Sequence, residues 1–338
     1  MKYAFQIWPH ANIRYMESLK KLSLAELKCI LGALNIEATP QFETIGGAPF
    51  LVFEASPLSP VALKHLFTHS ALYMLWEIQG ETFTPITPAY PWYLGSDLAE
   101  ILKYRGKTNA SFTMLLLNLA LTAGDYFNSE VPLTILDPLC GKATTLFCAL
   151  RRGDNAIGIE LDKKALKECG DFFAKYLQSY RFKHKKALSS LTLQKGKAAP
   201  KTAFTFANDA TRFENGATRS LDLILADTLD TAHLLKPESV HLIAADLPYG
   251  VQHAPGGGAK EKGLIPLLKK ALPGWRQVLK KGGTIALSFN TFTLSKADLS
   301  LALKSAGFTV LNCAPYDDFD HYVEQAVNRD VVIAKKEA

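Results

Sequence analysis

The sequence lacks the features of a disulfide-stabilised, metal-binding or membrane-spanning protein. It has five cysteines but no CxxC pair and no metal-ligand spacing beside its eight histidines. This pattern excludes a disulfide framework and a structural zinc site. No apolar run approaches the roughly 20 residues that span a bilayer. We therefore expect a protein of the reducing cytoplasm that binds neither metal nor membrane.

One long stretch of the chain lacks acidic residues. No Asp or Glu occurs in residues 172–208, which carry eight basic ones: Lys175, Arg181, Lys183, Lys185, Lys186, Lys195, Lys197 and Lys201. In a chain of net charge +6, this excess favours an anionic partner, because lysines that neutralise phosphates give nucleic-acid affinity. We predict that residues 182–220, the basic insertion, bind nucleic acid through Lys183, Lys185 and Lys186. The alternative is a solvated, mobile loop, because KGKAAPK has a flexible composition.

The chain of 338 residues is long for a single core, so two domains are expected. Residues 1–82 have the pattern of a small α+β domain. It is expected to hold strands at KYAFQIW and FLVFEA, a helix at SLAELKCILGALNI capped by Ser23, and a helix at VALKHLFTHSALYMLWEI. Three prolines at three-residue spacing then predict a linker over residues 83–95.

From residue 96 to 338 the pattern changes to alternating strands and helices, which predicts a doubly wound, Rossmann-like α/β domain. Its strands are expected at TILDPL, AIGIEL, SVHLIAADL and GGTIALSFNTF, with an antiparallel pair near the C-terminus. Helices are expected at SFTMLLLNLALTAGDYF, TTLFCALRR, KKALKECGDFFAKYLQSY and GLIPLLKKALPGWRQVLKK.

Acidic residues close three of these strands, namely Asp137, Glu160 and Asp246. Ligands of doubly wound sheets bind beyond the carboxyl ends of the strands, and an acid at the second strand can accept the hydroxyls of a ribose. Gly141 lets the backbone approach a ligand closely. A single acid at a strand end is often only a turn or helix cap, but three in this order predict a ligand site.

Two motifs carry a resemblance to a known family. DPLCGKATTL resembles the first motif, DPxCGSGT, of class I methyltransferases that act on nucleic-acid amines, and DLPYG resembles their catalytic motif, (D/N)PPY. With YRGKTNASFT, the chain is most similar to tRNA guanosine-10 N2-methyltransferases, and next to THUMP-domain guanine methyltransferases. The chain departs from the pattern at Ala143, where the family has its second glycine, and at Leu247, where it has proline.

The resemblance implies an S-adenosylmethionine site. Asp137 and Gly141 would hold the methionine end and Glu160 the ribose. Asp227 would receive the adenine amine; Asp209 is its rival, at a longer spacing from Asp246. Further cofactor contacts are expected from Pro138, Cys140, Thr144, Leu161, Thr228 and Thr108.

The resemblance also implies the catalytic residues. Asp246, with the carbonyl of Leu247 or Pro248, would accept hydrogen bonds from the target amine, and Tyr249 would stack on the flipped base. The chemistry supports these roles, because an aryl amine is a poor nucleophile. Acceptors aimed at its N–H bonds favour pyramidalisation and stabilise the positive charge that develops.

The expected substrate is the N2 amine of a guanine in tRNA or another structured RNA, with residues 1–82 as an RNA-binding type of domain. Arg105 and Lys107 would contact phosphate or the cofactor carboxylate, with surface solvation as the alternative. The resemblance also allows a small activating protein subunit. Two other functions stay open: a DNA or protein amino-methyltransferase on the same scaffold, and a catalytically silent RNA-binding relative.

Overall fold

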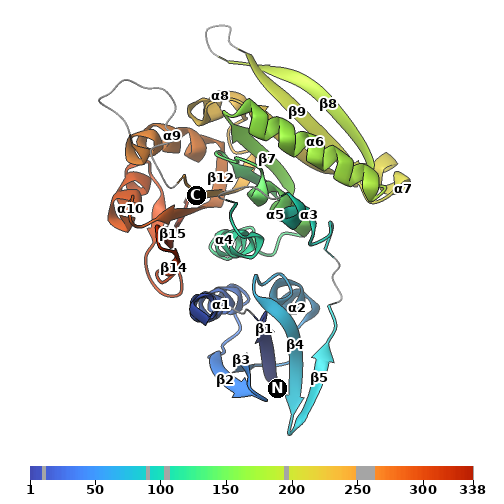
Figure 1. Ribbon diagram of the computed structural model, residues 1–338, viewed down its shortest axis with the longest axis vertical. Coiled ribbons are helices and arrows are strands. Elements are labelled where there is room, and N and C mark those ends of the chain that lie inside the picture. Colours follow the sequence, from blue (N-terminus) through green and yellow to red (C-terminus); the bar gives the residue numbers. More distant parts are fainter. Residues whose placement is uncertain (10–12, 89–91, 103–106, 194–197, 249–262, 338) are drawn as a thin grey trace.

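The computed structural model describes residues 1–9, 13–88, 92–102, 107–193, 198–248 and 263–337. The chain forms two sheets, each with its own helices (Figure 1). In the parts so described, no helix is both long enough and apolar enough to cross a bilayer.

The N-terminal sheet is antiparallel, with the order β2-β3-β1-β4-β5. Its strands are β1 (Lys2–Ile7), β2 (Gln41–Ile45), β3 (Ala48–Glu54), β4 (Leu72–Gln79) and β5 (Thr82–Ile86), and its helices are α1 (Ile13–Ala33) and α2 (Pro60–Leu66). Successive side chains of a strand point to opposite faces, so Tyr3, Phe5 and Ile7 pack under the helices while Ala4 lies on the other face. This unit contains residues 1–86, so β5 extends into the predicted linker.

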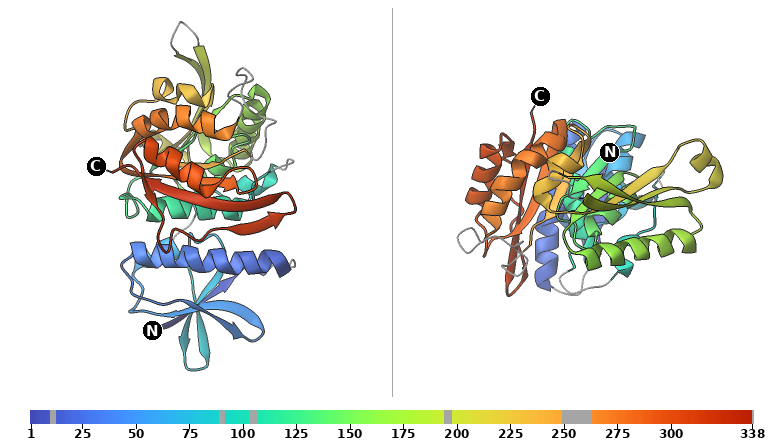
Figure 2. Two further views of the ribbon diagram at one scale, coloured as in Figure 1. Left: turned by 90° about the vertical axis from the view of Figure 1, so that its left-hand side faces the viewer. Right: turned by 90° about the horizontal axis from the view of Figure 1, so that it is seen from above.

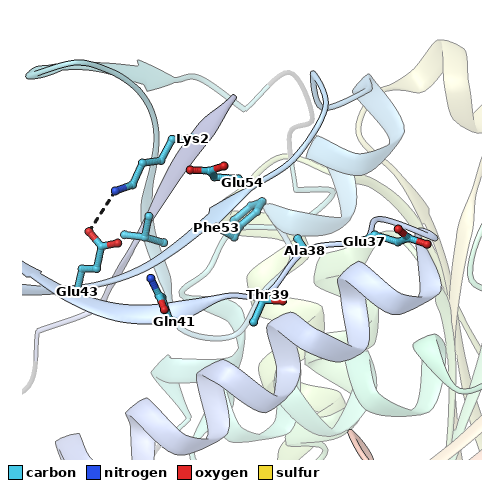
Figure 3. Close-up of a pocket in the computed structure, with 9 residues that line it drawn as sticks. Lys2, Glu37, Ala38, Thr39, Gln41, Glu43, Phe53 and Glu54 are labelled. Carbon is cyan, nitrogen blue, oxygen red and sulfur yellow. Dashed lines mark hydrogen bonds and ion pairs between the residues drawn. The ribbon is translucent and has the colours of Figure 1, made fainter.

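The second face of this sheet is hollowed (Figure 3). The hollow has a volume of about 650 Å³ and contains Glu37, Glu43 and Glu54 among its lining residues. Lys2 is 3.3 Å from Glu43 across it. With three carboxylates and one lysine among its lining residues, this hollow is unsuited to phosphate.

Two expectations for the N-terminal unit are wrong. The helix predicted over residues 61–78 ends at Leu66, and β4 begins at Leu72. A short apolar run does not distinguish a helix from a buried strand by its period alone. Ser23 is not an N-cap, because it lies inside α1, where its hydroxyl donates to the carbonyl of Leu19 at 2.5 Å.

The larger sheet has the order β13-β15-β12-β11-β6-β7-β10-β9-β8, with β14 paired to β15. Five neighbouring strands are parallel: β6 (Thr134–Asp137), β7 (Asn155–Glu160), β10 (Arg219–Leu225), β11 (Val240–Asp246) and β12 (Leu279–Asn290). The remaining strands are β8 (Lys183–Thr192), β9 (Ala198–Ala207), β13 (Thr309–Leu311), β14 (His321–Glu324) and β15 (Val327–Lys335). From β6 the chain proceeds to β7 and β10 on one side, then to β11 and β12 on the other, so the switch point lies between β6 and β11.

Helices cover both faces of the parallel strands, which confirms the predicted doubly wound fold. One core contains side chains of α3 (Leu98–Ile101), α4 (Ala110–Thr122), α5 (Thr144–Arg152) and α6 (Lys163–Ser179). The other contains side chains of α8 (Thr231–Leu234), α9 (Leu264–Val278) and α10 (Lys296–Ser305). The antiparallel strand β15 pairs with both β12 and β13, as expected for the C-terminal region.

The basic insertion forms a long hairpin of β8 and β9 that extends the sheet beyond β10 (Figures 1 and 2). Its base is followed by α7 (Ala210–Glu214). The rings of Phe204 and Phe206 lie 5.3 Å from that of Phe173 of α6, so the hairpin shares the core beneath that helix. The alternative of an unstructured loop is therefore wrong for residues 183–192 and 198–207.

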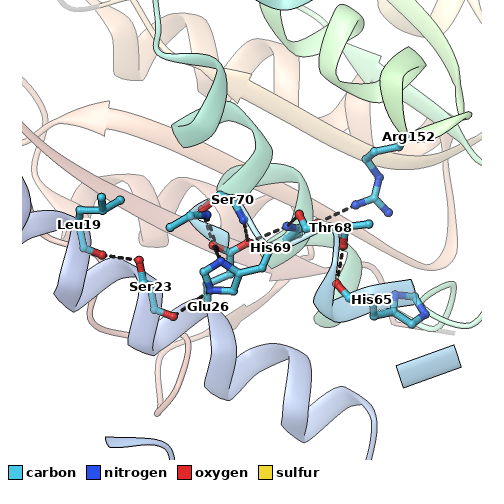
Figure 4. Close-up of polar contacts among 10 residues, drawn as sticks. Leu19, Ser23, Glu26, His65, Thr68, His69, Ser70 and Arg152 are labelled. Carbon is cyan, nitrogen blue, oxygen red and sulfur yellow. Dashed lines mark hydrogen bonds and ion pairs between the residues drawn. The ribbon is translucent and has the colours of Figure 1, made fainter. Parts of the chain in front are cut away.

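A buried polar network joins the two units (Figure 4). The Glu26 side chain is fully buried, and its Oε1 accepts from the Ser70 amide at 3.0 Å and from Asn118 Nδ2 at 2.6 Å. The amide oxygen of Asn118 accepts from Arg152 at 2.6 Å, and Arg152 in turn donates to Asp154 at 3.2 Å. This chain of contacts runs from α1 through α4 to the end of α5 and fixes the N-terminal unit against the larger one.

Candidate functional site

Acidic side chains gather where the parallel strands end. Asp137 closes β6, Glu160 closes β7 and Asp246 closes β11, and these strands are neighbours in the sheet. Burial raises the pKa of Asp137 to about 7; hydrogen bonds from Thr145 and the Leu139 amide oppose this rise, and the nearby charges of Glu160 and Asp246 add to it. The three carboxylates thus act on a common region, and such a region favours a positively charged ligand.

The loop after β6 is fixed to this edge through its backbone. The amide of Leu139 donates to Asp137 at 3.1 Å, and the Cys140 side chain is buried against Gly158 of β7. A Cβ on Gly158 would lie 2.6 Å from Cys140 Sγ, so the close packing of loop and strand requires this glycine. The Cys140 side chain is therefore committed to the core, and Pro138 beside it is buried as well.

Gly141 and Ala143, the two positions at which the resembled motif has glycine, differ in their surroundings. Gly141 has a φ of +49°, and a Cβ there would meet nothing within 4 Å, so open space adjoins its backbone. Ala143 has a φ of +69° and is fully buried at the start of α5. A left-handed non-glycine residue costs about 1–2 kcal/mol. Thr144, the first residue of α5, is buried beside it.

Glu160 is held by backbone amides on both of its oxygens. Oε2 accepts from Gly141 at 2.9 Å, and Oε1 accepts from Leu161 at 2.7 Å and Asp162 at 2.8 Å. A carboxylate has about four acceptor positions, so these bonds leave room for a ligand hydroxyl. The Leu161 side chain is 52% exposed beside it.

The sheet topology separates Asp227 from Asp209. Asp227 follows β10 at the same edge as Glu160, and it accepts from the Leu229 amide at 3.0 Å. It begins a short 3-10 helix, η2 (Thr228–Asp230), in which the Thr228 hydroxyl accepts from Trp275 Nε1 at 3.0 Å. Asp209 follows β9, which is antiparallel to β10, and therefore lies at the opposite edge as the N-cap of α7.

Asp246 is the centre of a polar cluster that includes two residues not expected from the sequence. Its Oδ1 accepts from the Ser288 hydroxyl of β12 at 2.8 Å, and its Oδ2 accepts from the Thr108 hydroxyl. Arg329 Nη2 of β15 lies 3.7 Å from Oδ2. Thr108, which was expected to bind cofactor, thus contacts the expected catalytic acid.

The rest of the DLPYG motif is described only in part. The side chain of Leu247 is 1% exposed in the core, and its amide donates to the Ser288 carbonyl at 2.8 Å. Leu247 can therefore meet a ligand only through its backbone, and Pro248 beside it is half-buried. Tyr249 and Arg105 lie outside the described residues.

The predicted phosphate-binding lysines lie on both faces of the hairpin. Lys183 and Lys185 are exposed on one face, whereas Lys186 lies on the other, 3.8 Å from Asp171 and 5.5 Å from the centre of the Phe204 ring. Lys107, beside the cofactor edge, is 3.4 Å from Glu100.

The position of Lys183 along the sheet follows from the strand pairing. Lys201 pairs with Ile224 near the edge that carries Glu160, and Ala207 pairs with Lys183. Six positions of β9, or about 20 Å of strand, therefore separate Lys183 from the acidic edge. The described residues contain no group of three or more His, Cys, Asp or Glu side chains arranged to hold a metal.

Comparisons with known proteins give structural likeness only. No protein-family model matches the chain, and no curated protein sequence matches it. TrmN from Thermus thermophilus is 17% identical with a TM-score of 0.41, over 88% of this chain and 60% of that chain. A TehB-like SAM-dependent methyltransferase from Corynebacterium glutamicum is 13% identical with a TM-score of 0.36, over 62% and 85% of the two chains. A putative rRNA methylase from Clostridium thermocellum is 15% identical with a TM-score of 0.35, over 63% and 94%.

Proposed function

We propose that this chain transfers a methyl group from S-adenosylmethionine to the exocyclic N2 amine of a guanine in RNA, with tRNA as the expected substrate. The observation that carries the proposal is the Asp246 carboxylate. It is fixed by Ser288 and Thr108 at the end of β11, beside the edge where Asp137 and Glu160 meet. An acceptor fixed at this place suits an N–H group brought to the edge of the sheet.

The residues of the acidic edge fit S-adenosylmethionine. The cofactor carries positive charge on its sulfonium and its amino group, which the carboxylates around Asp137 favour. The open space beside Gly141 accepts close approach of a ligand, and the remaining acceptor position of Glu160 suits a ribose hydroxyl. Asp227, which follows β10 at the edge that carries Glu160, would receive the adenine amine.

The proposed mechanism depends on alignment. When bound, the cofactor supplies a methyl group already activated on sulfonium. Asp246 would accept an N–H of the guanine amine, which would orient the nitrogen lone pair and stabilise the positive charge on the nitrogen as the N–C bond forms and the S–C bond breaks. Asp246 is held by hydroxyl donors before substrate arrives, so little reorganisation is needed. The extra proton then leaves the nitrogen to solvent.

The charge distribution supports an RNA site on the larger unit. Residues 1–82 carry six Lys and Arg against seven Asp and Glu, a net charge of −1, whereas the whole chain carries +6. Phosphate contacts are expected where cations are in excess, as on the exposed hairpin face of Lys183 and Lys185. The N-terminal unit would then contribute to RNA recognition through its shape and its position, and not through an excess of positive charge.

The deciding experiment compares the parent chain with Asp246→Ala on unmodified tRNA and radiolabelled S-adenosylmethionine. Single-turnover rates should fall about a hundredfold or more, the scale of losing one preorganised electrostatic contact. Mass spectrometry of nucleosides from the tRNA methylated by the parent chain should detect N2-methylguanosine. Asp125→Ala is the control. Asp125 is exposed, lies away from the acidic edge, and forms an ion pair with Lys335 whose N–O distance is 2.6 Å.

Several results would redirect or contradict the proposal. Methylation of DNA or protein, but not of tRNA, would keep the chemistry and change the substrate. Cofactor binding without transfer to any of these substrates, or a normal single-turnover rate for Asp246→Ala, would contradict the mechanism. RNA binding with no cofactor binding would indicate the catalytically silent relative.

A further inference from the structure

Arg329 is a buried cation beside the expected catalytic acid. It belongs to β15, the antiparallel strand that the chain inserts between β12 and β13. Its side chain is 8% exposed, and its Nη2 lies 3.7 Å from Oδ2 of Asp246. At this exposure the guanidinium cannot readily reach a phosphate of a large RNA. Its charge therefore acts on neighbouring groups inside the protein.

An aromatic ring holds the guanidinium, and strand pairing places its backbone. Its central carbon lies 4.4 Å from the centre of the Phe112 ring of α4, a stacking distance for a cation on an aromatic face. Arg329 also pairs in register with Asn290, two residues beyond Ser288 on β12. The same two strands therefore deliver Ser288 to one oxygen of Asp246 and Arg329 to the other.

We infer that Arg329 is a positioning residue for methyl transfer, which orients the Asp246 carboxylate together with Ser288 and Thr108. The inference rests on the proposed function. Ser288 and Thr108 supply hydrogen bonds from two directions, whereas Arg329 supplies charge at a distance beyond a hydrogen bond. The charge acts on Oδ2, so the three residues together hold both oxygens of the carboxylate in one orientation.

The orientation matters more than the stability of the pair. A partly buried ion pair is weak evidence for stability, because desolvation offsets the attraction. A small misplacement of a group that must meet the transition state, however, lowers turnover strongly. Arg329 should therefore affect kcat and leave the affinity for cofactor and RNA unchanged.

The test is a comparison of Arg329→Met with Lys335→Met. Lys335 lies on the same strand, is also in an ion pair, and pairs with Thr284 far along β12 from Ser288. Arg329→Met should lower kcat on tRNA about tenfold or more, with the KM for tRNA and the Kd for S-adenosylmethionine within twofold of the parent. Lys335→Met should leave kcat unchanged, and Arg329→Lys should recover part of the loss.

A double-mutant cycle separates positioning from a general structural effect. In an Asp246→Asn background, Arg329→Met should cost little further activity, because the carboxylate that it orients is gone. If the parent is active, two results would overturn the inference without touching the proposed function. One is an equal loss of activity from Arg329→Met in both backgrounds, and the other is a kcat of Arg329→Met equal to that of the parent. A parent that transfers no methyl group to RNA would overturn the proposed function and the inference together. If Arg329→Met does not fold, Arg329→Lys takes its place in the cycle, with a smaller kcat loss expected.

Discussion

The backbone amide of Gly141 donates to Oε2 of Glu160 across 2.9 Å and so ties the loop after β6 to the end of β7. The other oxygen of Glu160 holds the amides of Leu161 and Asp162, where α6 begins. One carboxylate therefore orders both loops of the proposed cofactor site before a ligand arrives. Its substitution should affect binding through the loops as well as through a lost acceptor.

Glu160→Ala should weaken S-adenosylmethionine binding by about 1–3 kcal/mol, the scale of losing hydrogen bonds to a charged group. Glu160→Gln should also weaken binding, because its NH₂ group would face a backbone donor on one side or the other. Calorimetric titration measures both effects. Glu168→Gln is the matched control, since Glu168 is a neighbouring acid that pairs with Lys142 at 2.6 Å. An unchanged affinity for Glu160→Ala would place the ribose elsewhere.

The affinity for S-adenosylmethionine should rise as pH increases through 7. Burial raises the pKa of Asp137 from 3.8 to about 7, so the free protein holds a proton there at pH 6 and loses it by pH 8. A cationic cofactor favours the ionised form, and binding near neutrality should therefore release a proton. Titrations in buffers of different ionisation enthalpy measure that release.

Asp137→Asn should abolish this pH dependence and the proton release. The same linkage predicts that Asp137 lowers the stability of the ligand-free fold as pH rises from about 4 to about 7, because the unfolded carboxyl loses its proton first. A parent affinity that is constant from pH 6 to 8 would contradict the proposed contact between Asp137 and the cofactor.

Ala143→Gly should leave thermal stability nearly unchanged, because opposing effects cancel. Glycine relieves about 1–2 kcal/mol of left-handed backbone cost at φ +69°. It also gives up about 0.8 kcal/mol of methyl burial and some 0.5–1 kcal/mol of backbone entropy. Ala143→Val should lose more than about 2 kcal/mol, since a β-branched residue suits neither the dihedral nor the fully buried site. Denaturant unfolding of the three proteins measures both differences.

The sequence predicted four of the five parallel strands, because they are apolar runs bounded by turns and three of them end in an acid, and it missed β10. The strands of the basic insertion were missed for a physical reason. Consecutive charges at Lys185 and Lys186 hide the alternation by which β8 turns one face to α6 and the other to solvent. Spacing to Asp246 favoured Asp227 over Asp209 in the sequence, and the antiparallel pairing of β9 with β10 places the two acids at opposite edges of the sheet.

The partners of Asp246 were beyond any local pattern. Ser288 lies opposite it in the register of β11 and β12, and Arg329 reaches it through the pairing of β12 with β15. These contacts join residues 42 positions apart in one case and more distant in the other. Sequence motifs locate the acid, whereas tertiary register decides which side chains orient it.

The last prediction concerns the exposed face of the hairpin. If Lys183 and Lys185 contact phosphates, Lys183→Gln and Lys185→Gln should each flatten the salt dependence of RNA binding by about one unit, and the double variant by about two. Lys186→Gln should have a smaller effect, because that side chain lies near Asp171 and over Phe204. Lys304→Gln is a control of equal charge change, as Lys304 is exposed on α10. Binding isotherms at several salt concentrations give the slopes.

Cofactor affinity should be the same in all variants, because Lys183 lies about 20 Å of strand from the acidic edge. A slope for the double variant equal to that of the parent and of Lys304→Gln would show that RNA does not meet this face.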